Sequence, residues 1–505
     1  MSDRSVDPAF LDLPRRALAD AALSAALQAG ASYADLRIHR ITDENIALRD
    51  GELESAVENR EIGVAVRVIV NGTWGFASHA ELSPDVAADT ARRAVSVATA
   101  LGPLNTEHID LAAEPVYRDA TWVSSYLIDP FDVPTADKIG VLREHSGRLL
   151  AADGVDHVSA GMRAVKEQTF YADTFGSSIT QQRVRVEPVL EAIAVDAAAG
   201  SFESMSTLAP PYGRGWEVLA GDDVWNWTDE LAQLPVLLAE KVKAPSVVAG
   251  PTDLVIDPTN LWLTIHESIG HATEYDRAIG YEAAYAGTSF ATPDKLGTMR
   301  YGSPVMTVTA DRTVEHGLAS IGYDDEGVQA QSWDLVRDGI FVGYQLDRVF
   351  APRLGQSRSN GCSYADSPHH VPIQRMANVS LQPAAEDIST ADLISRVEDG
   401  IYIVGDKSWS IDMQRYNFQF TGQRFYKIRD GRLDGQLRDV AYQATTTDFW
   451  NSMEAVGGLS TWVLGGAFNC GKAQPGQVAA VSHGCPSALF RGVNVLNTRT
   501  EGGRG

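Results

Sequence analysis

The chain has 505 residues, of which 44% are hydrophobic and 21% charged, a composition typical of folded globular proteins. It is longer than the roughly 250–300 residues at which a single core stops growing, so at least two domains are expected. The formal net charge of −24 argues against nucleic acids and anionic membrane surfaces as partners, because like charges repel.

Targeting signals and cysteine usage bear on the compartment. The N-terminal segment has no apolar core of a signal peptide, and no stretch reaches the roughly 18 apolar residues of a membrane-spanning helix. The three cysteines, Cys362, Cys470 and Cys485, are too few for a disulfide framework. These features predict a cytoplasmic protein in which a functional cysteine is a metal ligand or a nucleophile.

The first part of the chain, residues 1–245, combines helical and strand patterns. Asn71-Gly72 between apolar runs is a strong hairpin signal, and a second strand pair is expected within Val155–Glu191. Helices are expected over Arg15–Gln28, from Pro84 after the N-cap Ser83 to about Leu101, and over Asp137–Ala152 and Trp227–Lys243. We therefore predict an N-terminal mixed α/β domain with antiparallel hairpins, involved in assembly and in forming one wall of a cleft.

The second part, residues 246–505, is richer in short strands and glycine turns. Strands are expected at Thr252–Ile256, Val305–Thr309, Gly339–Leu346, Ile401–Asp406 and Gly431–Asp439. One long helix is expected over Thr259–Arg277, because apolar residues recur there at helical spacing. The predicted fold class is thus α+β, with a β-rich C-terminal domain that carries this helix.

The predicted helix contains His266-Glu267-Ser268-Ile269-Gly270-His271, a zincin-like motif with one extra residue. On a regular α-helix, residues five apart point about 140° away from each other, so both histidines cannot face one metal. A local distortion such as a π-bulge is therefore expected at Ile269–His271, where Gly270 offers a permissive backbone.

Chemically, this set suits a hydrolytic metal site. Two neutral imidazoles are good zinc ligands, and a catalytic site keeps one position open for water. Glu267, next to the first histidine, is placed to take a proton from that water.

Two histidines need a third ligand, and the residues alone leave several candidates. Glu274 follows His271 closely, whereas Cys470, His483 with Cys485, and His369-His370 lie further along the chain. Each type is an established metal ligand, so chemistry does not choose between them.

Several segments together resemble the TldD/PmbA family of metallopeptidases. The resemblance spans nearly the whole chain and is strongest between Asp257 and Pro486. Its motifs are His266–Asp276, Asp324–Gly327, Asp347-Arg348, Ser357–Gly361, Arg375–Asn378, Cys470-Gly471-Lys472 and Ser482–Gly484, with Val64–Gly75 and Gly213–Trp216 in the first half.

The resemblance implies roles for individual residues. His266, His271 and Cys470 would hold one zinc ion per chain, and Glu267 would be the general base. Three further residues are interpreted from their chemistry rather than from the resemblance. Glu274 would orient one of the histidines, with a solvated helix face as an equal alternative. His483 would line the cleft or hold a structural hydrogen bond, and Arg375 would bind a peptide carboxylate or form a structural ion pair.

The resemblance also implies partners and substrates. Chains of the TldD type keep the histidine motif and the cysteine, whereas TldE/PmbA-type chains lack them, so this chain resembles the catalytic subunit. We expect a heterodimer with such a paralogue, or a homodimer, acting on unfolded or short peptides.

Two other functions remain open from the sequence. One is a non-enzymatic regulator or assembly subunit with a structural metal, which a closed four-ligand site would indicate. The other is a metal-dependent amidase acting on a small molecule, which a narrow closed pocket would indicate.

Overall fold

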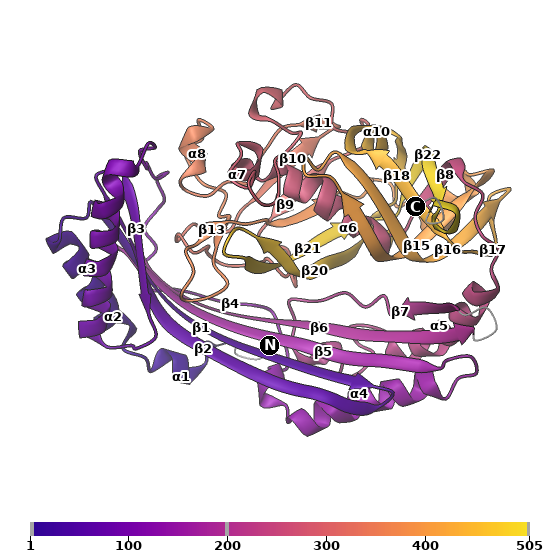
Figure 1. Ribbon diagram of the computed structural model, residues 1–505, viewed down its shortest axis with the longest axis horizontal. Coiled ribbons are helices and arrows are strands. Elements are labelled where there is room, and N and C mark those ends of the chain that lie inside the picture. The colour runs from indigo at the N-terminus through magenta and orange to yellow at the C-terminus, as the bar shows by residue number, and fades with distance from the viewer. Residues whose placement is uncertain (1–4, 197–200, 502–505) are drawn as a thin grey trace.

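The computed structural model describes residues 5–196 and 201–501. It has mixed helices and strands, and the predicted α+β class is confirmed. Figure 1 shows a long curved sheet from the first half of the chain, with the second half lying along its concave face. No helix among the described residues is long and apolar enough to cross a membrane.

The curved sheet is built mainly from two long antiparallel hairpins. Its strand order is β3-β2-β1-β5-β6-β4, with β7 paired to β6. The strands are β1 (Tyr33–Arg49), β2 (Glu52–Val70), β3 (Thr73–His79), β4 (Ala120–Val123), β5 (His157–Asp173), β6 (Ser178–Asp196) and β7 (Ser201–Ser206). Asn71 and Gly72 both have positive φ, 48° and 73°, so the predicted tight hairpin between β2 and β3 is confirmed.

Helices cover the sheet face that points away from the second half (Figure 1). After the short α1 (Pro8–Leu11), α2 (Arg15–Gln28) and α3 (Pro84–Leu101) share one core with β1 and β2. At the other end, α4 (Thr135–Leu150) and α5 (Trp227–Lys243) pack in a second core with β5 and β6. These four helices are confirmed, with α4 starting and ending two residues before its predicted bounds.

The second half is centred on a sheet that closes on itself. Strand β8 (Gly250–Ile256) lies between β15 (Asp399–Ile411) and β22 (Ala488–Asn497). The order continues through β18 (Val440–Thr445) to β16 (Asn417–Arg429), which pairs back with β15 and forms a ring. Strands β17 (Arg432–Leu437) and β19 (Met453–Val456) are added to β16 and β22.

Smaller sheets and helices pack around this ring. One four-stranded sheet joins β11 (Ile340–Phe341), β10 (Ser332–Arg337), β9 (Val308–Asp311) and β14 (Asn378–Leu381). Two further sheets have two strands each. They pair β12 (Ser363–Tyr364) with β13 (Ile373–Gln374), and β20 (Val463–Lys472) with β21 (Gln477–Cys485). The remaining helices are α8 (Phe350–Arg353), α9 (Thr390–Ser395), α10 (Thr446–Asn451) and α11 (Thr498–Glu501). The strand predicted over Gly339–Leu346 is wrong beyond Ile340–Phe341, because the chain turns away to reach the metal-motif segment.

The long helix predicted over Thr259–Arg277 is divided into four pieces. These are α6 (Pro258–Ile265), the π-helical turn η4 (His266–Gly270), the 3₁₀ turn η5 (His271–Thr273) and α7 (Tyr275–Ala278). Glu274 has extended backbone, φ −73° and ψ 117°, and lies beside Gln345 in a β-bridge. This bridge ends the helix, which apolar periodicity alone does not reveal.

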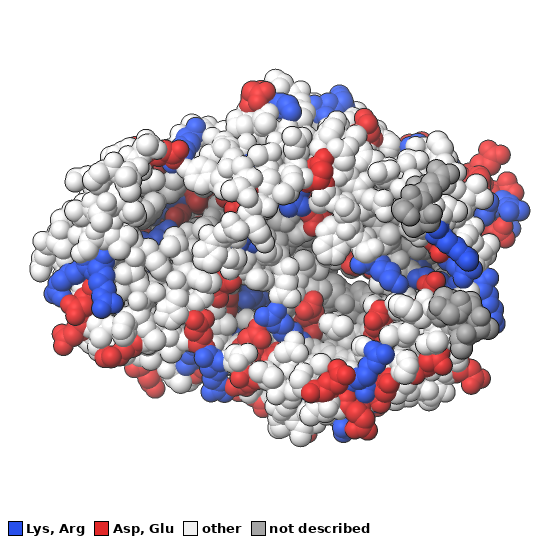
Figure 2. Space-filling view, in the orientation of Figure 1, with Lys and Arg blue, Asp and Glu red and all other residues white. Residues whose placement is uncertain are grey.

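Polar contacts connect the two halves. Arg37 on β1 pairs with Asp325, and Arg67 on β2 with Glu326. The division of the chain near residue 245 into two domains stays a prediction, since the halves share this buried contact. Charged side chains of both signs are scattered over the face shown in Figure 2.

Candidate metal centre

The histidine motif lies where the helix changes from α to π geometry. The backbone N–H of His271 donates to the carbonyl of His266, an i→i+5 bond that defines the π turn. Such a turn brings residues five apart onto one face, so the imidazole centroids of His266 and His271 lie 4.7 Å apart. The predicted distortion is confirmed, although it starts at His266, three residues earlier than expected.

Side chains from other elements stabilise the distorted turn. Tyr301 donates its hydroxyl hydrogen to the Ser268 carbonyl, and Gln345 Nε2 donates to the Gly270 carbonyl at 2.8 Å. Because a π turn disturbs the regular hydrogen-bond ladder, these partners satisfy groups that would otherwise be buried and unpaired.

Gly270 has ordinary helical backbone, with φ −52° and ψ −61°, so its expected conformational freedom is not used. A Cβ atom there would lie 2.5 Å from Met376 Sδ. The glycine is needed for this close approach rather than for an unusual backbone angle.

Cys470 reaches the two histidines from strand β20. Ligand atoms of His266, His271 and Cys470 all lie within 4.8 Å of one another, and all three residues are buried. Cys470 Sγ lies 3.5 Å from His271 Nε2. The β20–β21 register shifts between Ala467 and Cys470, and a bulge of this kind re-aims the following side chains.

Hydrogen bonds fix which nitrogen of His266 is available. His483 Nδ1 lies 2.9 Å from the Val379 carbonyl, which can only accept, so this nitrogen carries the proton. His483 Nε2 lies 2.7 Å from His266 Nδ1 and therefore accepts its proton. Burial lowers the pKa of both imidazoles, which keeps them neutral, and His266 Nε2 keeps a free lone pair.

The second histidine is oriented by a carboxylate. Glu274 Oε2 accepts a hydrogen bond from His271 Nδ1 at 2.8 Å, which directs the His271 Nε2 lone pair toward Cys470. Lys472 Nζ lies 3.1 Å from Glu274 Oε1 and 2.8 Å from Asp276 Oδ1. Burial opposes ionisation of Glu274, but Lys472 and His271 outweigh it and hold its pKa well below the ordinary value.

Strand alternation explains the spacing of Cys470 and Lys472. Residues two apart on a strand face the same side, so the thiol meets His271 while the ammonium meets Glu274. Burial alone would raise the pKa of Cys470, but the neighbouring His271 outweighs this effect. The pKa of the thiol is therefore below the ordinary value, which favours a thiolate ligand.

Glu267 is buried beside the histidines and faces a cation. Its Oε2 accepts a hydrogen bond from Arg415 Nη1 at 2.6 Å. Burial alone would raise its pKa, but its surroundings, the Arg415 guanidinium among them, hold it below the ordinary value, so Glu267 is ionised. A carboxylate in this state can accept a proton.

Arg375 does not face the cavity as a carboxylate clamp. Its guanidinium is buried and donates to the carbonyls of Cys470 and Gln477, the latter at 2.9 Å. The ion pair named as its alternative is absent among the described residues. Arg375 instead fixes the backbone that carries Cys470.

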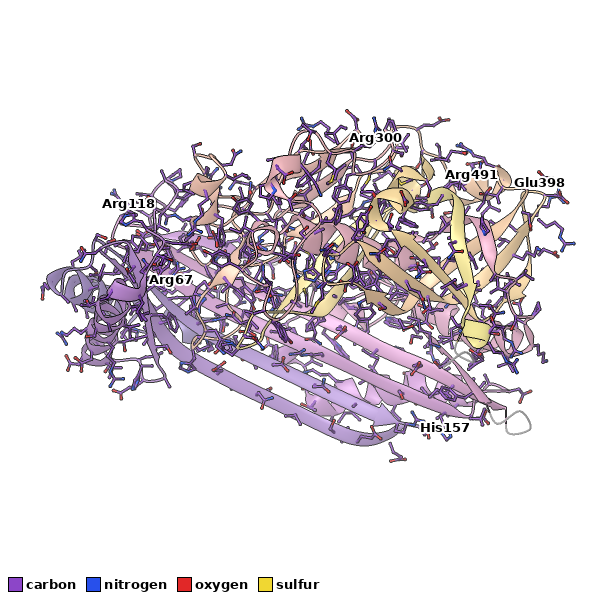
Figure 3. The ribbon with its side chains drawn as sticks, turned by 45° about the horizontal axis from the view of Figure 1, so that its top comes forward. Arg67, Arg118, His157, Arg300, Glu398 and Arg491 are labelled. Carbon is purple, nitrogen blue, oxygen red and sulfur yellow. The ribbon has the colours of Figure 1, made fainter. Side chains whose placement is uncertain are left out.

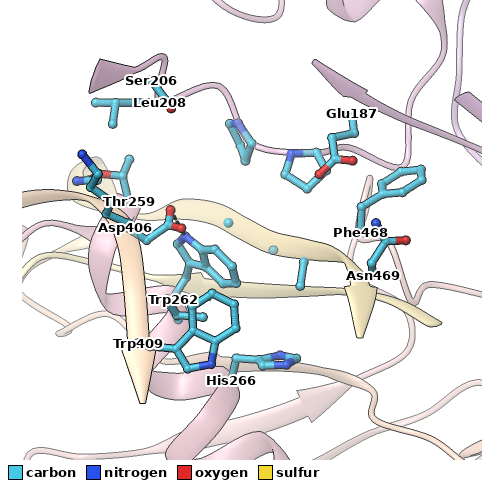
Figure 4. A pocket seen from close by; sticks show the side chains of 18 of the residues that line it. Glu187, Ser206, Leu208, Thr259, Trp262, His266, Asp406, Trp409, Phe468 and Asn469 are labelled. Atoms are coloured by element: carbon cyan, nitrogen blue, oxygen red, sulfur yellow. Dashed lines mark hydrogen bonds between the residues drawn. The ribbon is translucent and has the colours of Figure 1, made fainter. Parts of the chain in front are cut away.

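A cavity of about 600 Å³ opens over these groups, between strand β6 and the second half of the chain. Figure 4 shows Trp262 and Trp409 on the side of His266, with Glu187 and Phe468 on the opposite wall. Much of β20 lines this cavity, and β20 pairs only with β21 among the described residues. One strand edge is thus left without a strand partner beside the cavity.

The donor set fits zinc. One thiolate and two imidazoles are ligands that zinc prefers, and three protein ligands leave a fourth position open. The other candidate ligands are elsewhere engaged. Cys485 Sγ contacts the Pro258 carbonyl, while His370 pairs with Asp366.

Comparison with known proteins gives the family. Models of the PmbA/TldA metallopeptidase domain 1 and C-terminal domain match residues 34–98 and 249–497. The chain belongs to the PmbA/TldD family of metallopeptidases. A metalloprotease of Methanothermobacter thermautotrophicus is 29% identical, with 92% of this chain and 96% of the relative covered. A zinc metalloprotease TldD homologue of Saccharolobus solfataricus is 22% identical, with 92% and 97% covered.

Solved structures share the fold. TldE from Thermococcus kodakarensis has a TM-score of 0.67 at 15% identity, covering 95% of this chain and 99% of its own. A candidate modulator of DNA gyrase from Thermotoga maritima has a TM-score of 0.75 at 15% identity, covering 95% and 100%. At this identity, the likeness concerns the fold alone.

Proposed function

We propose that this protein is a zinc-dependent peptidase and the catalytic, TldD-type member of its family. The observation that supports it most directly is the convergence of His266, His271 and Cys470 beside the ionised Glu267. Relatives of this chain carry the names metalloprotease and zinc metalloprotease, in agreement with that chemistry.

The protein's own side chains divide the work. His266 Nε2, His271 Nε2 and Cys470 Sγ would hold one zinc ion, which when bound polarises a water molecule and lowers its pKa to about 7. Glu267 takes a proton from the attacking water and delivers it to the leaving amine. Trp262 and Trp409 line the same cavity and offer apolar surface beside these groups.

The substrate is proposed to be an unfolded or short peptide. The unpaired edge of β20 beside the cavity offers backbone hydrogen bonds to an extended chain, independent of its side chains. The strand edge, rather than the cavity volume of about 600 Å³, favours an extended peptide, because pockets for small molecules also span about 300–1,000 Å³.

The partner is proposed to be a paralogous TldE/PmbA-type subunit, with a homodimer as the alternative. The likeness to TldE supports this, because the two chains share one fold, as expected of paralogous subunits. The three-ligand site with an open position argues against a purely structural metal.

The test is cleavage of an unstructured peptide by the zinc-loaded chain, alone and with its paralogue. Glu267→Ala should abolish cleavage while zinc stays bound, whereas Glu398→Ala, an exposed glutamate at the edge of the molecule in Figure 3, should not change it. Full activity of Glu267→Ala would contradict the proposed mechanism.

Metal content is measured on the same preparations. His271→Ala and Cys470→Ser should lose zinc, whereas His157→Ala, an exposed histidine at the end of the first sheet, should retain it (Figure 3). Unchanged zinc in both site variants would contradict the proposed ligand set.

A further inference from the structure

Arg415 lies in the turn between β15 and β16 and faces the proposed general base. Its Nη1 donates to Glu267 Oε2 at 2.6 Å, and it lines the same cavity as His266 and His271. This contact engages one carboxylate oxygen of Glu267, Oε2.

The Arg415 side chain is only 15% exposed, yet it makes few hydrogen bonds. A guanidinium carries five N–H donors, yet neither Nε nor Nη2 of Arg415 has an acceptor among the described residues. By contrast, Nε, Nη1 and Nη2 of the surface residue Arg491 all donate hydrogen bonds. Arg415 therefore keeps donor capacity beside the cavity, because its Nη2 is not engaged by the described residues.

The turn holds Arg415 in an unfavourable backbone conformation. Its φ is 63°, in the left-handed region that residues with a Cβ atom seldom occupy. The Asp412 carboxylate accepts from the backbone N–H groups of Gln414 and Tyr416 at 3.0 and 2.8 Å, and Thr446 Oγ1 donates to the Arg415 carbonyl at 2.7 Å. Strained backbone conformations that several surrounding hydrogen bonds hold in place are typical of functional sites.

A second cation on the cavity wall is directed elsewhere. Lys407 Nζ bonds to Ser204 Oγ at 3.1 Å, on the strand β7 that belongs to the first sheet. Among the described residues, the cation paired with Glu267 is Arg415, which lines the cavity together with Trp409.

We propose that Arg415 is a catalytic residue of the peptide hydrolysis proposed above: Nη1 holds the carboxylate of Glu267, and Nη2 donates to the carbonyl oxygen of the scissile bond. The inference rests on the proposed peptidase function. It assigns to this chain's own arginine the stabilisation of negative charge on the substrate.

The charge movement in the reaction favours this position. As the water oxygen bonds to the carbonyl carbon, the π electron pair moves onto the carbonyl oxygen, and Glu267 takes the water proton. Negative charge thus leaves the Glu267 carboxylate and appears on the substrate carbonyl oxygen, the two groups that Arg415 contacts in this proposal. The proton then passes to the amide nitrogen, the C–N bond breaks, and an amine and a carboxylic acid are released. A guanidinium fixed between both oxygens stabilises this transfer without reorganisation.

The experiment compares Arg415→Gln, Arg415→Asn and Arg415→Lys with wild type in the zinc-loaded protein and its active assembly. Asn tolerates the positive φ, so it guards against a folding defect. Arg429→Gln, on the exposed end of β16, is the control. We expect kcat to fall about 100- to 1,000-fold in the Gln and Asn variants with a smaller change in KM. Arg415→Lys should recover part of the loss.

A second readout does not depend on turnover. Affinity for a phosphinic peptide, whose anionic tetrahedral group mimics the transition state, should fall by a similar factor as kcat/KM, while zinc content and melting temperature stay unchanged. Affinity for an uncleavable peptide of the same sequence with a planar amide should change little.

Distinct results would overturn the proposal. Unchanged kcat and phosphinic-peptide affinity in Arg415→Gln would exclude a catalytic role. A loss confined to KM for peptides with a free C-terminal carboxylate, and absent for amidated peptides, would show that Arg415 binds that carboxylate instead. If wild type cleaves no peptide, the peptidase function fails and the role of Arg415 fails with it; if wild type cleaves and Arg415→Gln equals it, only the role of Arg415 fails.

Discussion

The Nδ1 atom of His266 lies 2.7 Å from the Nε2 atom of His483, so a third histidine fixes the proton of a candidate zinc ligand. His483 in turn is held by the Val379 carbonyl and by the face of Trp262, whose ring lies nearly parallel to it at 6.2 Å. An imidazole–imidazole–carbonyl chain of this kind keeps His266 neutral and its Nε2 directed at the metal position.

His483→Ala is therefore predicted to weaken zinc binding by about 10- to 100-fold, because His266 loses the acceptor that orients its ring. Competition with a chelator of known affinity measures this. His483→Gln, whose side-chain oxygen can still accept, should lose less. His145→Ala removes another buried histidine, stacked on Trp227 in the first half, and should leave zinc affinity unchanged. Equal affinities of wild type and His483→Ala would contradict the prediction.

Lys472→Met is predicted to destabilise the fold by about 3–5 kcal/mol, because it removes the cation that two buried carboxylates share and leaves Glu274 only the more distant Arg277, at 3.5 Å. Urea denaturation measures the free energy of unfolding. Lys427→Met is the matched control, since its partner Asp399 is exposed and such pairs contribute about 0–1 kcal/mol. Similar losses in both variants would show that Lys472 is not the main compensating charge.

Much of the fold was accessible from the sequence where the signal is local. The tight turn at Asn71-Gly72 and the helices α2 and α5 depend on nearby residues, and their predicted bounds are confirmed. The end of the metal-motif helix depends on Glu274 pairing with Gln345, about seventy positions away, and periodicity carries no such signal.

The same distinction applies to the site. The five-residue spacing of His266 and His271 required a distorted helix, and η4 provides it. Lys472 was visible in the Cys-Gly-Lys motif, and strand alternation would have placed it on the side of Cys470. Arg415 lies in a hairpin turn without any motif, so only the folded ring of strands reveals that it meets Glu267.

Glu187 is predicted to make stability depend on pH. Burial raises its pKa to about 7, only partly opposed by Arg163, and the carboxyl accepts no hydrogen bond among the described residues. A raised native pKa means that the folded state binds more protons than the unfolded state. Its stabilising contribution is complete below the ordinary value of about 4.3 and is lost as pH rises through about 7.

Glu187→Gln tests this, because the amide stays neutral at every pH. Relative to the variant, wild type should lose stability between pH 5 and pH 8, by at most about 3 kcal/mol. Denaturation of both proteins at the two pH values gives the difference. A constant difference between wild type and Glu187→Gln would mean that the carboxyl titrates alike in the folded and unfolded states.

Gly270→Ala is predicted to destabilise the protein by about 1–3 kcal/mol, because the new methyl group would lie 2.5 Å from Met376 Sδ and 2.8 Å from Met376 Cε. The backbone there is ordinary helix, so steric overlap is the whole cause. Gly140→Ala, in α4 with nothing within 4 Å of the added atom, should instead stabilise by about 0.5–1 kcal/mol.

A double-mutant cycle separates overlap from strain. Met376→Ala alone leaves a cavity, but in its presence the Gly270→Ala methyl group has room. The double variant should therefore be more stable than the sum of the single effects by at least about 1 kcal/mol in urea denaturation. Additive effects would mean that Gly270 matters for the π turn itself. In that case Gly270→Ala would also weaken zinc binding, because His271 follows it directly and would no longer be aimed at Cys470.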